Sequence, residues 1–141
     1  MIIAVDFDGT IVEHKYPKIG KELPFAIETL LDLKADGHQL ILWTARDGEL
    51  LDEAIKFCKD RGLEFYAVNS NRPSGMQFKE TMKKSAKVIA DVYIDDHNLG
   101  GLPDWGTIYQ MIHYNKTWND INSKHPSSYE YEKPKKKWWQ F

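Results

Sequence analysis

The sequence predicts an α/β fold with a mainly parallel sheet, and three observations support this class. Short apolar runs alternate along the chain with segments whose apolar residues recur at helical spacing. Parallel neighbours need a crossover connection, and the helical segments stand where such crossovers belong. Three of the apolar runs end in acids or a hydroxyl, and in open α/β sheets the ligand crevice lies outside the carboxyl ends of the strands. These strand ends are therefore predicted to meet in one crevice.

The first predicted strand is the apolar run at residues 2–5, whose composition is typical of a strand buried inside a parallel sheet. Asp6 and Asp8 follow it with a strand-like period of two, so both carboxylates can leave the sheet edge on one side. Gly9 then allows a sharp turn. Two like charges this close repel each other, and a bound cation relieves the repulsion. The alternative is a strand that ends in a simple polar Asp-Gly turn.

A loop and a helix are predicted next. The stretch 11–23 mixes charges with a tyrosine, a proline and a glycine and has no sustained period, so it is expected to form a loop or short hairpin over the end of the first strand. Pro24 suits a first helical position, and apolar residues between 26 and 33 recur near helical spacing. Gly37 is placed as the terminator of this helix.

The second apolar run, at residues 38–43, also ends in polar residues. Apolar residues between 50 and 58 continue with helical spacing up to Gly62, so residues 44–48 are predicted to be a strand-to-helix turn. This turn places the Thr44 hydroxyl and free backbone N–H groups beside a helix N-terminus, which favours anions such as phosphate. In the alternative interpretation, Thr44 only caps the helix.

The remaining predicted elements bring further acids to a strand end. They are a short strand at 65–68, a turn at 69–75, a short lysine-rich helix at 76–86, a strand at 88–94 and a last helix at 105–114. Asp95 and Asp96 come directly after the last of these strands, and they are expected to reach the same crevice as the earlier acids.

Composition sets broad limits on the function. The 141 residues are enough for one domain with its own core, here placed at residues 1–114. Cys58 is the single cysteine, and no apolar run is long enough for a membrane span, so a cytoplasmic setting and no membrane partner are expected. The 19 basic and 21 acidic side chains give a net charge of −2, which provides no argument for binding nucleic acid.

The C-terminal tail, residues 115–141, differs in character from the rest. It interleaves lysines with tryptophans, tyrosines and a final phenylalanine. Basic and aromatic residues together can bind nucleic acid, but aromatic side chains of this size usually mark packing surfaces. The tail is therefore predicted to pack on the domain or on another subunit, which makes it a candidate homo-oligomer contact.

The polar residues at the strand ends indicate a metal-assisted phosphate chemistry. Asp6, Asp8, Asp95 and Asp96 with the Thr44 hydroxyl form a hard oxygen set that suits Mg²⁺ better than zinc. Mg²⁺ in proteins keeps few carboxylates, several waters and a phosphate oxygen, so the expected ligand is phosphorylated. One aspartate can then attack phosphorus while a second exchanges protons with the leaving oxygen and with water.

Three segments resemble the motifs of the haloacid dehalogenase-like (HAD) hydrolases. Val-Asp-Phe-Asp-Gly-Thr-Ile-Val at 5–12 looks like their first motif, Leu-Trp-Thr-Ala-Arg at 42–46 is similar to their second, and Tyr-Ile-Asp-Asp at 93–96 is similar to their acidic fourth. The match spans residues 1 to 113. It implies a three-layer Rossmann-like sandwich and a Mg²⁺-dependent phosphatase that forms an aspartyl-phosphate.

The resemblance also assigns roles to individual residues. It implies that Asp6 is the nucleophile and Asp8 the general acid/base, that Thr44 holds the phosphate, and that Asp95 and Asp96 are the acids on the metal side. Asp6 joins these acids as a metal ligand, and Asp8 would contribute its backbone carbonyl. Other residues of the first two motifs are the expected substrate contacts: Gly9, Thr10, Ala45 and Arg46.

The lysine of the third motif is less well defined. Lys87 is the preferred candidate, because Lys-x-x-Ala-Asp-x-Tyr-Ile-Asp-Asp resembles the spacing of small members without a cap domain. The rivals are Lys79, Lys83 and Lys84. The stretches 11–43 and 45–86 are filled by the predicted elements, so there is no room for a sizeable cap. An open site admits small phosphorylated substrates as well as larger ones.

Two other classes of function fit parts of the same pattern. A phospho-accepting signalling module would use an acid-lined α/β sheet and Mg²⁺ in a similar way, but it does not need a dedicated acid/base at Asp8. A catalytically idle scaffold would act only through the partner that its tail binds. The phosphatase accounts for more of the motifs than either alternative.

Overall fold

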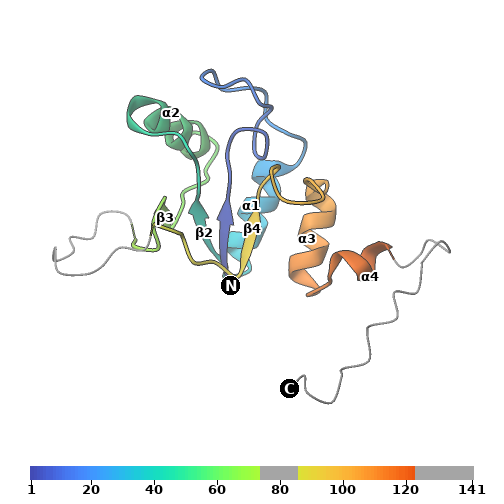
Figure 1. Ribbon diagram of the computed structural model, residues 1–141. Helices are drawn as coiled ribbons and strands as arrows, with labels where there is room; N and C mark the ends of the chain where they lie inside the picture. The colour runs from blue at the N-terminus through green and yellow to red at the C-terminus, as the bar shows by residue number, and fades with distance from the viewer. Residues whose placement is uncertain (74–85, 123–141) are drawn as a thin grey trace, which may run out of the picture. The chain divides into compact units, whose positions relative to one another are not determined.

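The computed structural model describes residues 1–73 and 86–122, and the chain divides into two compact units, Met1–Tyr109 and Gln110–Phe141. The first unit is built on a four-stranded parallel sheet with the strand order β3-β2-β1-β4 (Figure 1). Its strands are β1 (Ile2–Val5), β2 (Gln39–Leu42), β3 (Ala67–Val68) and β4 (Val92–Ile94). The described helices are α1 (Ala26–Ala35), α2 (Gly48–Lys59), α3 (Trp105–His113) and α4 (Trp118–Asn122).

The order of the strands determines where a ligand site can form. From β1 the chain steps outward to β2 and β3, and it then returns to place β4 on the other side of β1. In a doubly wound sheet the crevice opens at such a reversal, outside the carboxyl ends of the central strands. Val5 is in register with both Leu42 and Ile94, so β1, β2 and β4 end level with one another. The residues that follow these strands therefore emerge along one edge.

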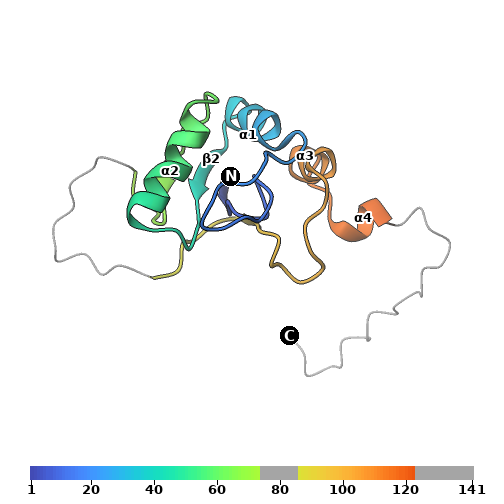
Figure 2. The same cartoon turned by 90° about the horizontal axis from the view of Figure 1, so that it is seen from above.

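The sheet is buried because its strands are almost wholly apolar, as parallel strands covered on both faces require. Ile3, Val5 and Leu42 have no exposed surface. Figure 2 shows α1 and α2 on the same side of the sheet, and α3 begins beside α1, where the Tyr109 hydroxyl donates to an Asp36 carboxylate oxygen at 3.0 Å.

The opposite face of the sheet carries a smaller apolar cluster. Its buried members are Ala4, Ile41, Ala67 and Val88, and half-buried aromatic side chains pack against them. The architecture fits the Rossmann-like three-layer sandwich without a sizeable cap, so the predicted fold class is confirmed.

The segment before β4 shows where the sequence pattern was misleading. The apolar run predicts a strand from residue 88, but β4 begins at Val92. Side chains satisfy the backbone at residues 88 and 89: the Asn71 amide bonds both the N–H and the C=O of Ile89, and the Tyr93 hydroxyl donates to the Val88 carbonyl. Val88 still packs on the sheet, so its apolar character reflects burial without strand pairing.

The start of α1 also differs from the expectation. Pro24 is not the first helical residue, because the helix begins at Ala26 and Phe25 occupies the N-cap position with a left-handed φ of 64°. Pro24 instead lies in the turn that leads into the helix. Gly37 is confirmed as the terminator, with a φ of 95° that favours glycine.

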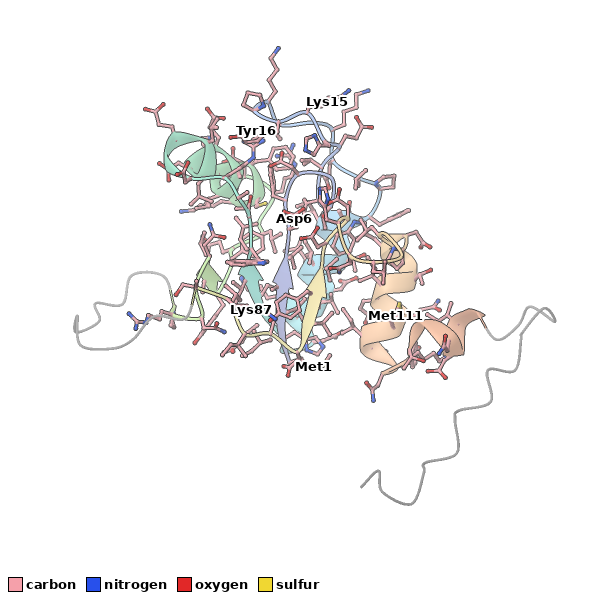
Figure 3. All side chains as sticks on the ribbon, in the orientation of Figure 1. Met1, Asp6, Lys15, Tyr16, Lys87 and Met111 are labelled. Carbon is pink, nitrogen blue, oxygen red and sulfur yellow. The ribbon has the colours of Figure 1, made fainter. Side chains whose placement is uncertain are left out.

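The stretch 11–23 forms the predicted hairpin over the end of β1. Val12 and Glu22 form an antiparallel bridge, and the Glu13 N–H donates to the Lys21 carbonyl at 2.7 Å. Figure 3 shows Lys15 and Tyr16 at the tip of this hairpin, beyond the strand end that carries Asp6. The hairpin is therefore placed to line one wall of a site at the sheet edge.

The second unit is described only as far as residue 122. Its helix α4, which the sequence pattern did not predict, begins with a reciprocal cap: the Thr117 N–H donates to an Asp120 carboxylate oxygen at 2.7 Å and the Asp120 N–H donates to the Thr117 hydroxyl at 3.3 Å. The predicted helix at 76–86 lies almost wholly outside the described residues, as does most of the tail. Within the described ranges, no helix is long and apolar enough to cross a membrane.

Candidate active site

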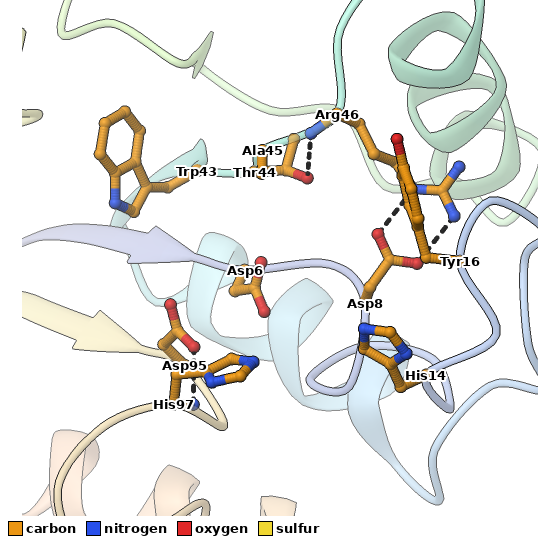
Figure 4. Close-up of a pocket in the computed structure, with 10 residues that line it drawn as sticks. All are labelled: Asp6, Asp8, His14, Tyr16, Trp43, Thr44, Ala45, Arg46, Asp95 and His97. Atoms are coloured by element: carbon orange, nitrogen blue, oxygen red, sulfur yellow. Dashed lines mark hydrogen bonds and ion pairs between the residues drawn. The ribbon is translucent and has the colours of Figure 1, made fainter.

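Three acids from two strand ends meet at the carboxyl edge of the sheet. Asp6 follows β1, and Asp95 and Asp96 follow β4. One carboxylate oxygen from each of the three lies within 4.8 Å of the others, and all three side chains are half-buried. Figure 4 shows Asp6 and Asp95 facing the same space. The convergence predicted from the strand ends is thus present in the structure.

Thr10 links the acids of this cluster. Its hydroxyl is buried and lies 3.1 Å from an Asp6 oxygen and 3.2 Å from an Asp96 oxygen, and it accepts the Asp96 backbone N–H at 3.1 Å. A threonine hydroxyl has one proton, so the two carboxylates share a single donor. The sequence predicted a substrate contact for Thr10, whereas the structure engages its side chain entirely with the acids.

Gly9 allows the two strand ends to approach each other. Its φ of 83° lies in the region that favours glycine, and a Cβ atom here would overlap the Asp96 carboxylate. The lack of a side chain at Gly9 is therefore a condition for Asp96 to reach the cluster. The substrate contact expected at Gly9 stays a prediction.

The three members of the cluster are all acids, so their negative charges repel one another. The pKa of Asp6 is raised from 3.8 to about 7, chiefly by burial and also by the nearby charge of Asp95 and a hydrogen bond with Asp96, while the Phe7 N–H and the Thr10 hydroxyl oppose the shift. A divalent cation would relieve this repulsion, and carboxylate oxygens at this spacing are ligands that Mg²⁺ accepts. The three acids therefore fit a hard divalent metal ion.

Asp8 points away from this cluster and into an ion pair. Both of its carboxylate oxygens accept from Arg46, from Nε at 2.6 Å and from Nη2 at 2.7 Å. Figure 4 shows this fork, with the Tyr16 ring over the guanidinium. Arg46 was expected to bind substrate, but its side chain has no exposed surface and is held by Asp8 and by backbone carbonyls.

Thr44 forms the wall of the site that faces Asp6 from β2. Its hydroxyl accepts the Arg46 backbone N–H at 3.1 Å, and its own backbone N–H donates to the Asn69 side chain at 2.8 Å. This turn precedes α2, as predicted, and Ala45 beside it is exposed. Among the described residues, the Thr44 hydroxyl acts only as an acceptor, so its proton can be donated to a ligand.

These groups surround one cavity of about 690 Å³ (Figure 4). Its lining residues are Asp6, Asp8, His14, Tyr16, Trp43, Thr44, Ala45, Arg46, Asp95 and His97. The hairpin contributes one wall and the end of β2 another. A cavity of this size is typical of a small-molecule site.

Lys87, the preferred third-motif lysine, lies outside this cavity. Its side chain is exposed, with Nζ 5.6 Å from the centroid of the Tyr93 ring. It lines a second cavity of about 320 Å³ that shares Trp43 and Asp95 with the first (the label in Figure 3 gives its place). Its catalytic role stays a prediction, and the rival lysines 79, 83 and 84 lie outside the described residues.

Comparison with known proteins identifies a relative but no activity. No protein-family model matches the chain, and no curated protein matches it. A solved structure, that of a conserved protein from Bacteroides thetaiotaomicron, is 59% identical in sequence and superposes with a TM-score of 0.82. The match covers 88% of this chain and 98% of that one. The chain belongs to the same family as this Bacteroides protein. Within this family the comparison establishes the fold, and the chemistry has to be argued from the site.

Two residues that support the site were missed from the sequence. Asn69, at the end of β3, has a left-handed φ of 50° and holds the Thr44 turn through its side chain. Trp105 is buried at the start of α3, and its indole N–H donates to the Thr10 carbonyl at 3.1 Å. An asparagine directly after an apolar run was the available signal for the first, because asparagine tolerates this conformation. The sequence pattern placed Trp105 only at the start of the last predicted helix.

Proposed function

We propose that the protein is a Mg²⁺-dependent phosphate monoester hydrolase of the HAD-like type, with Asp6 as the nucleophile. The meeting of Asp6, Asp95 and Asp96 at one point, across the cavity from Thr44, is the observation that carries the proposal. The three acids offer a site for a cation, and Thr44 offers a hydroxyl to a phosphate oxygen. Asp8 supplies a further carboxylate that lines the same cavity.

The reaction would proceed in two steps, transfer of the phosphoryl group to Asp6 and hydrolysis of the acyl phosphate. In the first, an Asp6 oxygen attacks phosphorus, the bond from phosphorus to the leaving oxygen breaks, and Asp8 gives that oxygen a proton to release an alcohol. In the second, Asp8 takes a proton from water while the water oxygen attacks phosphorus. The bond from phosphorus to Asp6 then breaks, which returns the free carboxylate and inorganic phosphate.

Each charged group would have a distinct part in these steps. Asp6, Asp95 and Asp96 would hold Mg²⁺, whose positive charge would offset the repulsion between the phosphate and the carboxylates. Thr44 would orient the phosphate by donating its hydroxyl proton. The Thr10 hydroxyl lies within hydrogen-bond distance of both Asp6 and Asp96 and can donate its one hydrogen to the nucleophile before substrate arrives.

The open cavity supports a broad substrate class. Its walls carry the rings of Tyr16 and Trp43 and the imidazoles of His14 and His97, and the described residues include no cap domain over it. A small phosphorylated metabolite fits its volume, and a larger phosphorylated molecule can extend outward past the hairpin. We therefore propose phosphate monoesters as the class without selecting one compound.

The test is release of phosphate from p-nitrophenyl phosphate with Mg²⁺ and with EDTA. We expect turnover only with Mg²⁺, and we expect Asp6→Asn to reduce it by at least about 1,000-fold because it removes the nucleophile. The matched control is Asp52→Asn, which changes an exposed aspartate on α2 in the same way. Unchanged turnover in Asp6→Asn would rule out this mechanism. A long-lived phosphoryl group on Asp6 without turnover would identify a phospho-accepting module instead.

A further inference from the structure

Arg46 is a buried cation whose hydrogen-bonding capacity is fully used. A guanidinium has five N–H donors. Two of them go to the Asp8 carboxylate, two go to the carbonyls of Pro17 and Lys18 in the hairpin, and one goes to the Leu50 carbonyl in α2 at 3.4 Å. One side chain thus connects the acid after β1, the hairpin above the cavity and the first turns of α2.

The geometry of the pair fixes the direction of the Asp8 carboxylate. A bidentate fork holds both oxygens in one plane, whereas a lysine would hold a carboxylate only as a point charge. The rings of Phe7 and Tyr16 lie 5.3 Å and 5.2 Å from the guanidinium carbon, so Arg46 is itself confined. Each carboxylate oxygen keeps a second lone-pair direction, and Asp8 still lines the cavity.

We propose that Arg46 is a positioning residue that aims the Asp8 carboxyl group at the leaving oxygen of the substrate. This inference rests on the proposed phosphatase function. Arg46 does not touch the reacting atoms in this role, because the protein uses all of its donors. Its hydrogen bonds to Pro17 and Lys18 also hold the hairpin wall against Asp8, so the leaving group and its proton donor are placed by the same side chain.

The proposal makes a prediction that a purely structural role does not make. A general acid matters most when the leaving oxygen is strongly basic, as in an alkyl phosphate, and least for a nitrophenolate. Misplacing Asp8 should therefore reduce hydrolysis of an alkyl phosphate far more than hydrolysis of p-nitrophenyl phosphate. A general loss of folding or of active protein would reduce both by the same factor.

The experiment compares kcat/KM for glycerol phosphate and p-nitrophenyl phosphate in Arg46→Lys, Asp8→Asn and wild type. We expect Arg46→Lys to lose about 10-fold more on the alkyl ester than on the aryl ester, and Asp8→Asn to show the same bias. The matched control is Arg61→Lys, because Arg61 also pairs with a carboxylate, donates to a carbonyl and lies over a phenylalanine ring. It lies outside the cavity lining, so its two losses should be equal.

The double variant provides a second test of the same idea. If Arg46 acts through Asp8, Arg46→Lys should add no leaving-group bias in an Asp8→Asn background. An equal loss on both substrates in Arg46→Lys, or a bias that persists without Asp8, would overturn the positioning role. If wild type hydrolyses neither ester, the phosphatase proposal itself fails, so the two failures are distinct.

A second variant covers the case in which Arg46→Lys does not fold. Asp8→Glu keeps the carboxylate but lengthens the side chain by one methylene, so the Arg46 fork can no longer hold it in the same direction. We expect this variant to show the alkyl-over-aryl loss as well. Equal losses on both substrates would contradict the claim that the direction of the carboxylate matters.

Discussion

The acids at the sheet edge differ in how their negative charge is compensated within the protein. Asp8 receives a full countercharge from Arg46 through two short hydrogen bonds. One carboxylate oxygen each of Asp6, Asp95 and Asp96 lies within 4.8 Å of the others. Among the described residues, their hydrogen-bond partners are hydroxyl and N–H groups, the His97 ring lies 3.8 Å from Asp96, and no lysine or arginine pairs with them. We propose that a cation from solution balances the charge of these three acids.

Removing the internal countercharge should have the largest effect on stability. Arg46→Met leaves Asp8 without its partner in a half-buried position, so we expect the free energy of unfolding to fall by about 3–5 kcal/mol. Arg61→Met removes an exposed pair instead and should cost less than about 1 kcal/mol. Urea unfolding of both variants measures the contrast. Similar losses in the two would show that the Asp8 pair has no special weight.

Adding Mg²⁺ should stabilise the protein through the cluster of Asp6, Asp95 and Asp96, and not through Asp8. Mg²⁺ at 100 times its dissociation constant should stabilise the wild-type protein by about 2.7 kcal/mol, because it binds the folded state alone. Asp96→Asn should abolish this gain, whereas Asp91→Asn, at an exposed aspartate before β4, should keep it. Thermal unfolding with Mg²⁺ and with EDTA reports both. An unchanged gain in Asp96→Asn would remove this acid from the proposed site.

The raised pKa of Asp6 makes the stability of the metal-free protein depend on pH. Between pH 4 and pH 7 the folded state keeps a proton on Asp6 that the unfolded state has lost, because burial and the neighbouring acids raise its pKa from 3.8 to about 7. The contribution of Asp6 to the free energy of unfolding is therefore fully present below pH 4 and is lost as the pH rises toward 7. We expect a loss of about 1–2 kcal/mol after solvent screening. Asp6→Asn in EDTA should flatten the profile, and a profile equal to that of wild type would contradict the assignment.

The smallest expected effect is at the turn that holds Thr44 in the cavity wall. Asn69→Ala removes the acceptor of the Thr44 backbone N–H, which should cost about 1 kcal/mol of stability. It should also raise KM for p-nitrophenyl phosphate more than it lowers kcat, because Thr44 is proposed to hold the phosphate. Asn71→Ala, which loses side-chain bonds to Ile89, is the control that should leave KM unchanged. A lowered kcat at constant KM would argue against this role.

The sequence predicted the acids at the strand ends, but it did not predict the pairing of Asp8 with Arg46. Apolar runs that end in Asp6, Thr44 and Asp95 predicted the sheet edge, because strand period and sheet topology act locally and leave a clear pattern. The pairing of Asp8 with Arg46 joins residues 38 positions apart, and no local pattern specifies it. Arg46 was consequently expected to bind substrate, although the structure buries it. Val88 was expected in a strand, because an apolar pattern records burial and does not record which groups satisfy the backbone.

The single hydroxyl of Thr10 can donate its hydrogen to either of two acids in the cluster. Its oxygen is fixed by the Asp96 N–H it accepts, while its hydrogen can rotate between an Asp6 oxygen and an Asp96 oxygen that lie at nearly the same distance. Rotation about one C–O bond thus redirects a dipole from one acid to the other without moving a heavy atom. If Asp6 becomes an acyl phosphate, as proposed, the hydrogen can turn to Asp96, so the cluster readjusts by rotation of one O–H group.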